Sequence, residues 1–304
     1  RTWQGTDPKW NDESKRTIYE ALQYKGGQVS FAEGSGLNSI IDIEAAVQKS
    51  NESDVIVVCL GEKPSTEKPG DIHSLDIEKA QVALVKELSK TGKPIVLVLV
   101  ENRPRIVREI EPLCQAILMA YQPSENGTDA LADIIYGQVN PSGKLPITYP
   151  RYTNTLLAYD HKYTDLLDTD FSENAFNPQW EFGHGMSYTN YEYSDLKVSK
   201  DTFNQKDELH ITVNVKNTGS QAGKETVLVF VSDQVASITP SVKRLRAFKK
   251  MSIKPNETKE FKFAINAQEL AFIGKDLTWV TEDGEYVVSV GNLSKKIVHR
   301  KTNE

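Results

Sequence analysis

The sequence predicts an α/β sandwich, in which a mostly parallel sheet carries helices on both faces, followed by an all-β sandwich. Three observations lead to this fold class. The 304 residues are enough for two domains at about 100–200 residues each. From about residue 12 to 150, short β-branched runs alternate with amphipathic helical stretches, which is typical of a parallel sheet covered by helices. Beyond about residue 185 the apolar period becomes two, as in antiparallel strands.

We expect the α/β domain to span residues 1–150. Its strands are expected at 28–32, 54–60, 94–100 and 114–121, and the last three are continuously apolar, as in strands buried on both faces. Its helices are expected at 40–49, 77–90 and 129–136, where apolar residues recur at helical spacing. Gly92 followed by Pro94 is a typical end for the second of these helices.

Residues 151–185 lose this rhythm and are predicted to form an extended linker. The region 186–304 then shows strict alternation, first at Leu209, Ile211, Val213 and Val215, and again in 227–231, 261–265 and 286–290. These runs are short and are separated by turn sequences such as Asn-Thr-Gly at 217–219. Together they predict a β-sandwich of about 100 residues.

Composition and spacing exclude several classes of function. The net charge is −6 and the basic residues form no stripe, so we expect no nucleic-acid partner. The longest apolar runs, 55–60 and 94–100, are far shorter than the roughly 20 residues of a membrane helix, so no membrane span is expected. The five histidines lack the spacing of metal ligands, and Gly-Ser-Gly at 34–36 does not complete a dinucleotide fingerprint. We therefore expect neither a metal nor a cofactor.

Cys59 and Cys114 both fall in apolar strand-like runs, where a free cysteine packs as a small hydrophobic residue, so no disulfide is expected. The chain opens at Arg1 with neither an initiator methionine nor an apolar leader. We therefore expect it to come from the middle of a longer polypeptide.

Residues 61–71, Gly-Glu-Lys-Pro-Ser-Thr-Glu-Lys-Pro-Gly-Asp, follow the strand expected at 54–60. Ligands of open α/β sheets bind beyond the carboxyl ends of the strands, so this loop is the first candidate for function. Its three carboxylates, two prolines and two glycines make a stiff polar segment that is able to present one acid into a cleft. By composition alone, a solvated surface loop is the alternative interpretation.

The loop 61–71 closely resembles the acid/base loop of glycoside hydrolase family 3, in its β-glucosidase and exo-β-glucanase branch. Three further segments agree. Thr-Trp-Gln-Gly at 2–5 is similar to the start of that family's second domain, Asn-Pro-Ser-Gly-Lys-Leu-Pro at 140–146 to its end, and Phe-Gly-His-Gly-Met-Ser-Tyr-Thr at 182–189 to the entry of the third. Residues 217–223 and 284–286 resemble the fibronectin type III-like domain of many members.

The resemblance implies a retaining mechanism, in which an Asp on an N-terminal (β/α)8 barrel attacks the anomeric carbon and Glu67 serves as general acid/base. It also implies that Trp3 helps to clamp the sugar at the +1 side, and that Glu62 is structural, hydrogen-bonding its own loop. The barrel and its nucleophile are absent from these residues. We therefore expect this chain alone to be inactive and to have the barrel of the same enzyme as its partner.

The implied substrate is a β-glucoside or a β-glucan oligosaccharide, from which glucose is released at the non-reducing end. Two alternatives stay open: a non-catalytic module that binds carbohydrate or protein, and a family 3 enzyme acting on xylose or arabinose. The resemblance also implies a secreted or periplasmic location.

Overall fold

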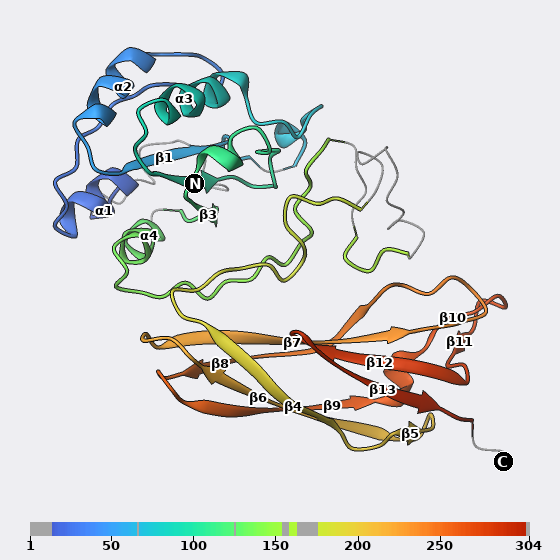
Figure 1. Cartoon of the computed structure of the whole chain (residues 1–304). Coiled ribbons are helices and arrows are strands. Elements are labelled where there is room, and N and C mark those ends of the chain that lie inside the picture. The colour runs from blue at the N-terminus through green and yellow to red at the C-terminus, as the bar shows by residue number, and fades with distance from the viewer. Residues whose placement is uncertain (1–13, 66, 125, 154–157, 163–175, 302–304) are drawn as a thin grey trace. The chain divides into compact units, whose positions relative to one another are not determined.

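The computed structural model describes residues 14–65, 67–124, 126–153, 158–162 and 176–301. The chain forms two compact units, each with its own core. The first comprises Arg1–Val139 and Pro150–Thr155, and the second comprises Asn140–Tyr149 and Leu156–Glu304. The first unit is built on a parallel sheet and the second on antiparallel sheets, which confirms the predicted fold class (Figure 1).

The sheet of the first unit contains β1 (Ile56–Gly61), β2 (Ile95–Val100) and β3 (Ala116–Tyr121), hydrogen-bonded in that order and all parallel. The central strand β2 is the most buried of the three, since four of its side chains are at most 1% exposed: Ile95, Leu97, Val98 and Leu99. Burial on both faces explains its continuous apolar run.

Helices lie on both faces of this sheet (Figure 1). The helix α1 (Ile18–Tyr24) packs with α4 (Thr128–Ile135), and α2 (Ile43–Asn51) packs with α3 (Lys79–Ser89). A capping box starts α1, because Thr17 Oγ1 accepts from the Glu20 amide while the Glu20 carboxylate accepts from the Thr17 amide. The α1–α4 cluster also includes Val57 of β1, so α1 and α4 cover that face of β1.

The structure corrects several sequence expectations in this unit. No strand forms at 28–32, and α1, which was not expected, precedes that segment. The helix expected at 40–49 begins only at residue 43, because Asp42 caps it by accepting from the Ala45 amide at 2.8 Å. The expectation that 54–60 and 114–121 are buried on both faces was wrong. These are the edge strands β1 and β3, and Cys59 of β1 is exposed.

The second unit contains two antiparallel sheets that form a sandwich, with one short parallel pair between β5 and β13. One sheet has the strand order β5 (Thr202–Phe203), β13 (Leu293–His299), β12 (Gly284–Val290), β7 (Gly223–Asp233) and β8 (Arg244–Ile253). The other has the order β4 (Tyr191–Val198), β6 (Glu208–Asn217) and β9 (Thr258–Asn266). A small hairpin joins β10 (Phe272–Ile273) to β11 (Trp279–Val280), after the short 3-10 helix η5 (Ala267–Leu270).

The core of the sandwich is made by the alternating residues that the sequence indicated. In β6, the side chains of Leu209, Ile211, Val213 and Val215 are fully buried, and they pack with Val227, Val229, Phe261 and Val288 from neighbouring strands. The intervening positions are polar and more exposed, which is the pattern of a sheet with one face on a core.

The segment 140–149 forms part of the second unit through contacts with 180–189. The amide of Leu145 donates to the His184 carbonyl at 2.7 Å, and the amide of Gly183 donates to the Leu145 carbonyl at 2.8 Å. The Asn140 side chain accepts from the Ser187 hydroxyl and the Tyr188 amide, both at 2.9 Å. Two of the sequence motifs quoted above are therefore held together as one hydrogen-bonded structure.

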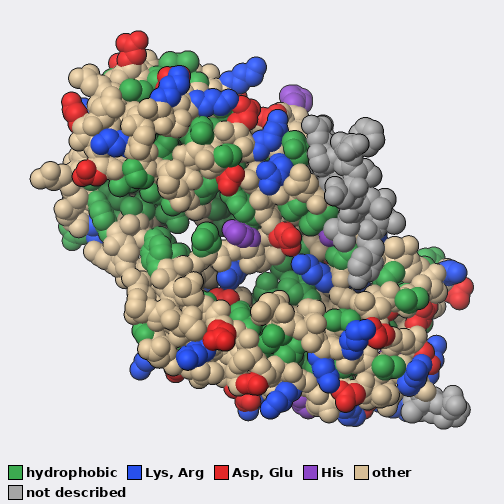
Figure 2. All heavy atoms as spheres, in the orientation of Figure 1, with side chains coloured by type: hydrophobic (Ala, Val, Ile, Leu, Met, Phe, Trp, Pro, Cys, Tyr) green, Lys and Arg blue, Asp and Glu red, His purple; other side chains and the backbone are tan. Residues whose placement is uncertain are grey.

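Both cysteines are free thiols. In the part of the chain that the structure describes, no helix combines the length and apolar character needed to cross a membrane. On the face shown in Figure 2, acidic and basic side chains are interspersed.

Candidate active site

The candidate site lies where the three parallel strands of the first unit end. Gly61, the last residue of β1, is paired with Val100 of β2, which is paired in turn with Tyr121 of β3. The loops that begin at residues 62, 101 and 122 therefore leave the sheet side by side. The carboxyl edge of a parallel sheet is where such folds bind ligands.

The loop 62–71 starts from a backbone position that only glycine fits. Gly61 has φ of +149°, and a Cβ there would lie 1.9 Å from the Val100 carbonyl oxygen. The buried side chain of Gln81 fixes this residue from α3, accepting from the Gly61 amide at 2.8 Å and donating to its carbonyl at 2.9 Å. The base of the loop is therefore rigidly placed.

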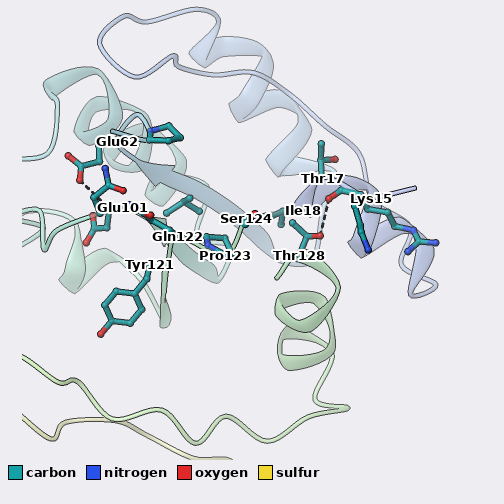
Figure 3. Close-up of a pocket in the computed structure, with 14 residues that line it drawn as sticks. Lys15, Thr17, Ile18, Glu62, Glu101, Tyr121, Gln122, Pro123, Ser124 and Thr128 are labelled. Atoms are coloured by element: carbon teal, nitrogen blue, oxygen red, sulfur yellow. Dashed lines mark hydrogen bonds between the residues drawn. The ribbon is translucent and has the colours of Figure 1, made fainter. Parts of the chain in front are cut away.

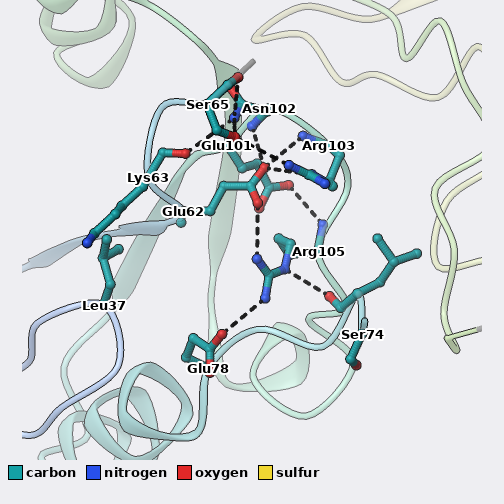
Figure 4. Close-up of polar contacts among 12 residues, drawn as sticks. Leu37, Glu62, Lys63, Ser65, Ser74, Glu78, Glu101, Asn102, Arg103 and Arg105 are labelled. Atoms are coloured by element: carbon teal, nitrogen blue, oxygen red, sulfur yellow. Dashed lines mark hydrogen bonds and ion pairs between the residues drawn. The ribbon is translucent and has the colours of Figure 1, made fainter. Parts of the chain in front are cut away.

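Glu62 connects this loop to the one after β2 (Figure 4). Its carboxylate accepts from the amides of Asn102 at 2.9 Å and Arg103 at 3.2 Å. It also pairs with Arg103 Nε at 3.2 Å and Arg105 Nη1 at 3.1 Å. The Glu62 side chain is only 7% exposed. Glu62 is thus structural, but the expectation that it bonds its own loop was wrong, because its partners lie about 40 residues later.

Arg105 extends this network toward the end of the loop region. Its guanidinium donates from Nε to the Leu75 carbonyl at 3.1 Å and from Nη2 to the Asp76 carbonyl at 2.5 Å. The same Nη2 lies 3.5 Å from a carboxylate oxygen of Glu78. One buried cation therefore holds both the beginning of the loop, through Glu62, and the segment 75–78 that follows it.

The middle of the loop is held by Asn102 and Ser65. The Asn102 side chain donates to Ser65 Oγ at 3.0 Å and to the Lys63 carbonyl at 3.3 Å. Gly70 packs against the same serine, since a Cβ at position 70 would lie 2.6 Å from Ser65 Oγ. The loop is therefore anchored on both sides of its central residues.

Glu67 stands between these anchors, at the start of the short 3-10 helix η2 (Lys68–Gly70). Its backbone has φ of 56° and ψ of −151°, which is strained for any residue but glycine. Its carbonyl accepts from the Gly70 amide at 2.9 Å. The side chain is exposed, and among the described residues its carboxylate makes no hydrogen bond or ion pair. The loop therefore presents Glu67, and also Asp71 at its end, as exposed carboxyl groups.

A cavity of about 320 Å³ opens at the same strand ends (Figure 3). Glu62 and Pro64 of the loop line it, together with groups from four other segments: Lys15–Ile18 before and within α1, Val100–Asn102 at and after the end of β2, Tyr121–Ser124 at and after the end of β3, and Thr128 at the start of α4. Glu67 is not among the lining residues. The cavity is thus adjacent to the clamped base of the loop.

Left-handed backbone recurs around this cavity. Besides Glu67, the non-glycine residues Tyr121 and Ser124 have φ of 53° and 55°. Burial, and then the nearby Glu101 carboxylate, raise the pKa of the Tyr121 phenol. Strained backbone of this kind is typical of functional sites, where the surrounding structure holds it.

Of the residues that the sequence and the resemblance singled out, Glu67 and Glu62 lie on the same loop. Trp3 lies outside the described residues. Sequence reasoning missed Gln81, Asn102, Arg103 and Arg105. The run Glu-Asn-Arg-Pro-Arg at 101–105, directly after a buried strand, is the signal that indicates three of them. Among the residues that the structure describes, no cluster of His, Cys, Asp or Glu has the makings of a metal site.

Residues 2–188 match the family described as the glycosyl hydrolase family 3 C-terminal domain. The chain belongs to glycoside hydrolase family 3. Residues 225–294 match the fibronectin type III-like domain, which coincides with strands of the second unit.

Curated relatives carry the names of two family 3 activities. The chain is 41% identical over 263 residues to a lysosomal β-glucosidase of Dictyostelium discoideum, covering 82% of this chain and 31% of that protein. It is 33% identical to a putative β-xylosidase of Formosa agariphila, over 86% of this chain and 35% of that protein. It is 31% identical to a periplasmic β-glucosidase of Salmonella typhimurium, over 84% of this chain and 35% of that protein. The chain thus spans about a third of the length of these family 3 relatives.

A solved β-glucosidase structure has a similar fold. The β-glucosidase of Listeria innocua in complex with glucose superposes with a TM-score of 0.80 at 29% identity, over 87% of this chain and 39% of that one.

Proposed function

We propose that this chain supplies the general acid/base, Glu67, of a retaining β-glucosidase or exo-β-glucanase that hydrolyses terminal non-reducing β-D-glucosyl residues. The observation that carries the proposal is that Glu67 is an exposed carboxyl group, without a hydrogen bond or ion pair to any described residue, between two anchored ends of a loop at the carboxyl edge of the sheet. Family membership and the β-glucosidase names of several relatives support it.

The proposed chemistry needs a second carboxylate, on the (β/α)8 barrel of the enzyme. In the first step the barrel Asp attacks the anomeric carbon and Glu67 donates its proton to the glycosidic oxygen. The bond between the anomeric carbon and the glycosidic oxygen breaks. In the second step the Glu67 carboxylate takes a proton from water, and the water oxygen attacks the anomeric carbon of the glucosyl-enzyme. The bond from that carbon to the barrel Asp breaks, which releases glucose and the free Asp carboxylate. The two carboxyl groups stand about 5–5.5 Å apart in such enzymes.

The loop must be held in place because the distance between the two carboxyl groups can vary only slightly. A general acid must reach hydrogen-bond distance of the oxygen that it protonates. The Glu62, Arg103 and Arg105 contacts hold the loop base, and the Asn102 and Ser65 contacts hold its middle. The side chain of Glu67 itself is left to meet the substrate and the barrel.

The proposal also covers the partners of the chain. A β-glucoside or β-glucan oligosaccharide is the substrate, Trp3 contacts it at the +1 side, and without the barrel the chain does not hydrolyse glycosides. A secreted or periplasmic location is supported by the periplasmic relative.

The test uses enzyme that contains this chain and its barrel, with and without Glu67→Ala. Two substrates are compared: dinitrophenyl β-glucoside, whose leaving group needs no proton, and phenyl β-glucoside, whose leaving group does. We expect the variant to lose about 10²–10⁴-fold in rate on the phenyl glucoside, as for loss of a general acid. On the dinitrophenyl glucoside we expect the glucosyl-enzyme to accumulate, and azide to restore turnover by forming glucosyl azide.

The matched control is Glu44→Ala, which removes an exposed carboxylate from α2 and leaves both rates unchanged. Equal rates for Glu67→Ala and the unmutated enzyme on both substrates contradict the acid/base role and favour a non-catalytic loop. Hydrolysis by the chain without its barrel contradicts the two-carboxylate arrangement.

A β-xylosidase is the second candidate, favoured by the Formosa agariphila relative. The same enzyme is assayed on aryl β-glucoside and β-xyloside with one leaving group. A higher kcat/KM for the xyloside contradicts the proposal that glucose is the sugar released. It does not bear on the role of Glu67, which the first experiment tests.

A further inference from the structure

A second cavity, of about 330 Å³, lies in the β-sandwich unit. It is formed by the ends of β7 and β8, by the connection 234–243 between these strands, and by the segment from η5 to β10. Its charged lining residues are Asp160, Lys162, Asp233, Arg244 and Arg246, and apolar groups such as Phe272 and Ile273 complete it. None of these residues belongs to the loop 62–71, so this cavity is independent of the function proposed above.

A β-bulge places the two arginines at this cavity. In the pairing of β7 with β8, Val229 lies opposite Ala247, Phe230 opposite Leu245 and Val231 opposite Arg244. Arg246 is therefore the extra residue and has no partner across the pair. Such bulges turn a side chain away from the direction that regular pairing gives it, and they are common next to binding sites.

The guanidinium groups of Arg244 and Arg246 share the cavity with the carboxylates of Asp160 and Asp233. Among the described residues neither forms an ion pair, and Arg246 Nε is buried without a hydrogen-bond acceptor. Burial, and then the charge of Arg244, lower the pKa of Arg246. A buried donor without an acceptor is uncommon in proteins, and two neighbouring guanidinium groups are suited to bind a carboxylate.

Asp233 adds an acceptor to the same cavity. Its Oδ1 accepts from the Val235 amide at 3.3 Å, while its Oδ2 is buried without a hydrogen-bond partner. The Tyr286 hydroxyl donates to the Glu282 carbonyl at 3.3 Å and is also close enough to the Asp233 carboxyl group to lower its pKa, although burial raises that pKa more. The cavity therefore offers Arg244 and Arg246 as donors and Asp233 as an acceptor, and in the described part of the chain neither arginine forms an ion pair with Asp233.

An exposed tryptophan lies opposite one of the lining residues. In the hairpin of β10 and β11, Trp279 lies directly opposite Ile273, which lines the cavity, so the two side chains share one face of the hairpin. Trp279 is 71% exposed. A large aromatic ring at this place is able to cover the apolar face of a sugar ring.

We propose that this cavity binds a hexuronic acid, with the carboxylate on Arg244 and Arg246, a ring hydroxyl donating to Asp233, and the ring against Trp279. A hydroxyl group both donates and accepts, and a uronic acid carries a carboxylate and hydroxyls on one ring. This single ligand class therefore satisfies the buried donor of Arg246 and the buried acceptor of Asp233 together.

The test is isothermal titration calorimetry of the full chain with glucuronic acid, glucose and acetate as separate probes. We expect glucuronic acid to bind more tightly than either of the others. Arg246→Gln weakens its binding about tenfold or more, as for loss of a charged hydrogen bond. Trp279→Ala, at an exposed position, weakens glucuronic acid binding without unfolding the chain. Lys249→Gln removes an exposed charge from β8, the strand of Arg246, and leaves the binding unchanged.

Three results overturn the proposal. Equal affinity for acetate and glucuronic acid means a site for simple anions, and equal affinity for glucose means that the carboxylate is not recognised. Absence of glucuronic acid binding to the unmutated chain removes the site altogether. Thermal unfolding of Arg246→Gln is measured alongside, and if that variant is unfolded, Trp279→Ala decides: unchanged affinity there also contradicts the proposal.

Discussion

Arg105 Nη1 lies 3.1 Å from Glu62 Oε2, and the two side chains are only 6% and 7% exposed. Two opposite charges have thus been removed from water at the base of the loop that carries Glu67. Breaking such a pair from one side leaves a buried charge with less compensation, which costs more than the loss of a surface pair.

Glu62→Gln keeps the shape of this side chain and removes its charge. We expect it to lower the free energy of unfolding of the α/β unit by about 3 kcal/mol. The measurement is urea denaturation followed by the helical circular dichroism signal. The control is Glu109→Gln, because Glu109 pairs with Lys86 at 2.6 Å but both side chains are about half exposed. We expect that change to cost less than about 1 kcal/mol, and equal losses for the two variants would contradict the role given to Glu62.

Gly61→Ala tests the close approach of β1 and β2. The added methyl would meet the Val100 carbonyl oxygen at 1.9 Å, and the backbone has a φ that disfavours any side chain. We expect a loss of roughly 3 kcal/mol or more in unfolding free energy, combining steric overlap and backbone strain. Gly92→Ala shares the positive φ, at +70°, but has open space around its Cβ. There we expect about 1 kcal/mol, so a similar loss at both positions would show that the contact with Val100 has no special effect.

Asn217→Ala tests the buried polar network of the sandwich. Asn217 is fully buried, and its side chain accepts from the Thr189 hydroxyl at 2.5 Å and donates to the Gln221 and Ile253 carbonyls at 2.7 and 3.1 Å. Removing it leaves several buried groups without partners, at about 1–3 kcal/mol each. We expect a clear fall in the thermal midpoint of the sandwich unit. Asn214→Ala, which removes one surface hydrogen bond to Asp195, should have little effect, and an equal fall would refute the importance of burial.

Asp233 makes the stability of the sandwich unit depend on pH. Burial raises the pKa of its carboxyl group above the usual value of 3.8. The folded state therefore holds this proton more tightly than the unfolded state, so its contribution to stability is present below pH 3.8 and is lost as pH rises through the folded pKa. In the unmutated chain we expect the free energy of unfolding to fall as pH rises from 3.8 through the folded pKa of Asp233. Asp233→Asn should show a smaller fall, measured by urea denaturation at a series of pH values. Asp201→Asn, at an exposed carboxylate, should follow the unmutated chain; if Asp233→Asn also does so, the prediction fails.

Strand β2 could be predicted to within one residue because its apolar run is buried on both faces and is bounded by polar positions. The segment 28–32 misled because its alternation of apolar and polar residues is that of a strand. Phe31 is 62% exposed there and its ring lies 5.4 Å from that of Tyr19, without a neighbouring strand to pair with. Strand β8 was not predicted because its sequence lacks a regular alternation of apolar and polar residues. The bulge at Arg246 interrupts its period, and Lys249 and Lys250 are exposed.

For the candidate site, the resemblance indicated the loop and Glu67, whereas the clamp that holds the loop needed the structure. Arg103 and Arg105 follow Glu62 by 41 and 43 positions, and local sequence patterns do not connect residues so far apart. What brings them together is the pairing of β1 with β2, which places the two strand ends side by side. The role of Gln81 is equally hidden, since a buried glutamine in an amphipathic helix gives no local sign of its partners.

The α/β unit is completed by residues 150–155, after the chain has first contributed the segment 140–149 to the second unit. Within the returning segment, the Tyr152 ring lies 4.9 Å from the Arg108 guanidinium carbon. During synthesis on the ribosome, the parallel sheet and its helices therefore emerge before the segment that completes their unit. The last residues of that unit leave the exit tunnel ahead of every strand of the sandwich, so all of the α/β unit is available to fold before the sandwich begins to form.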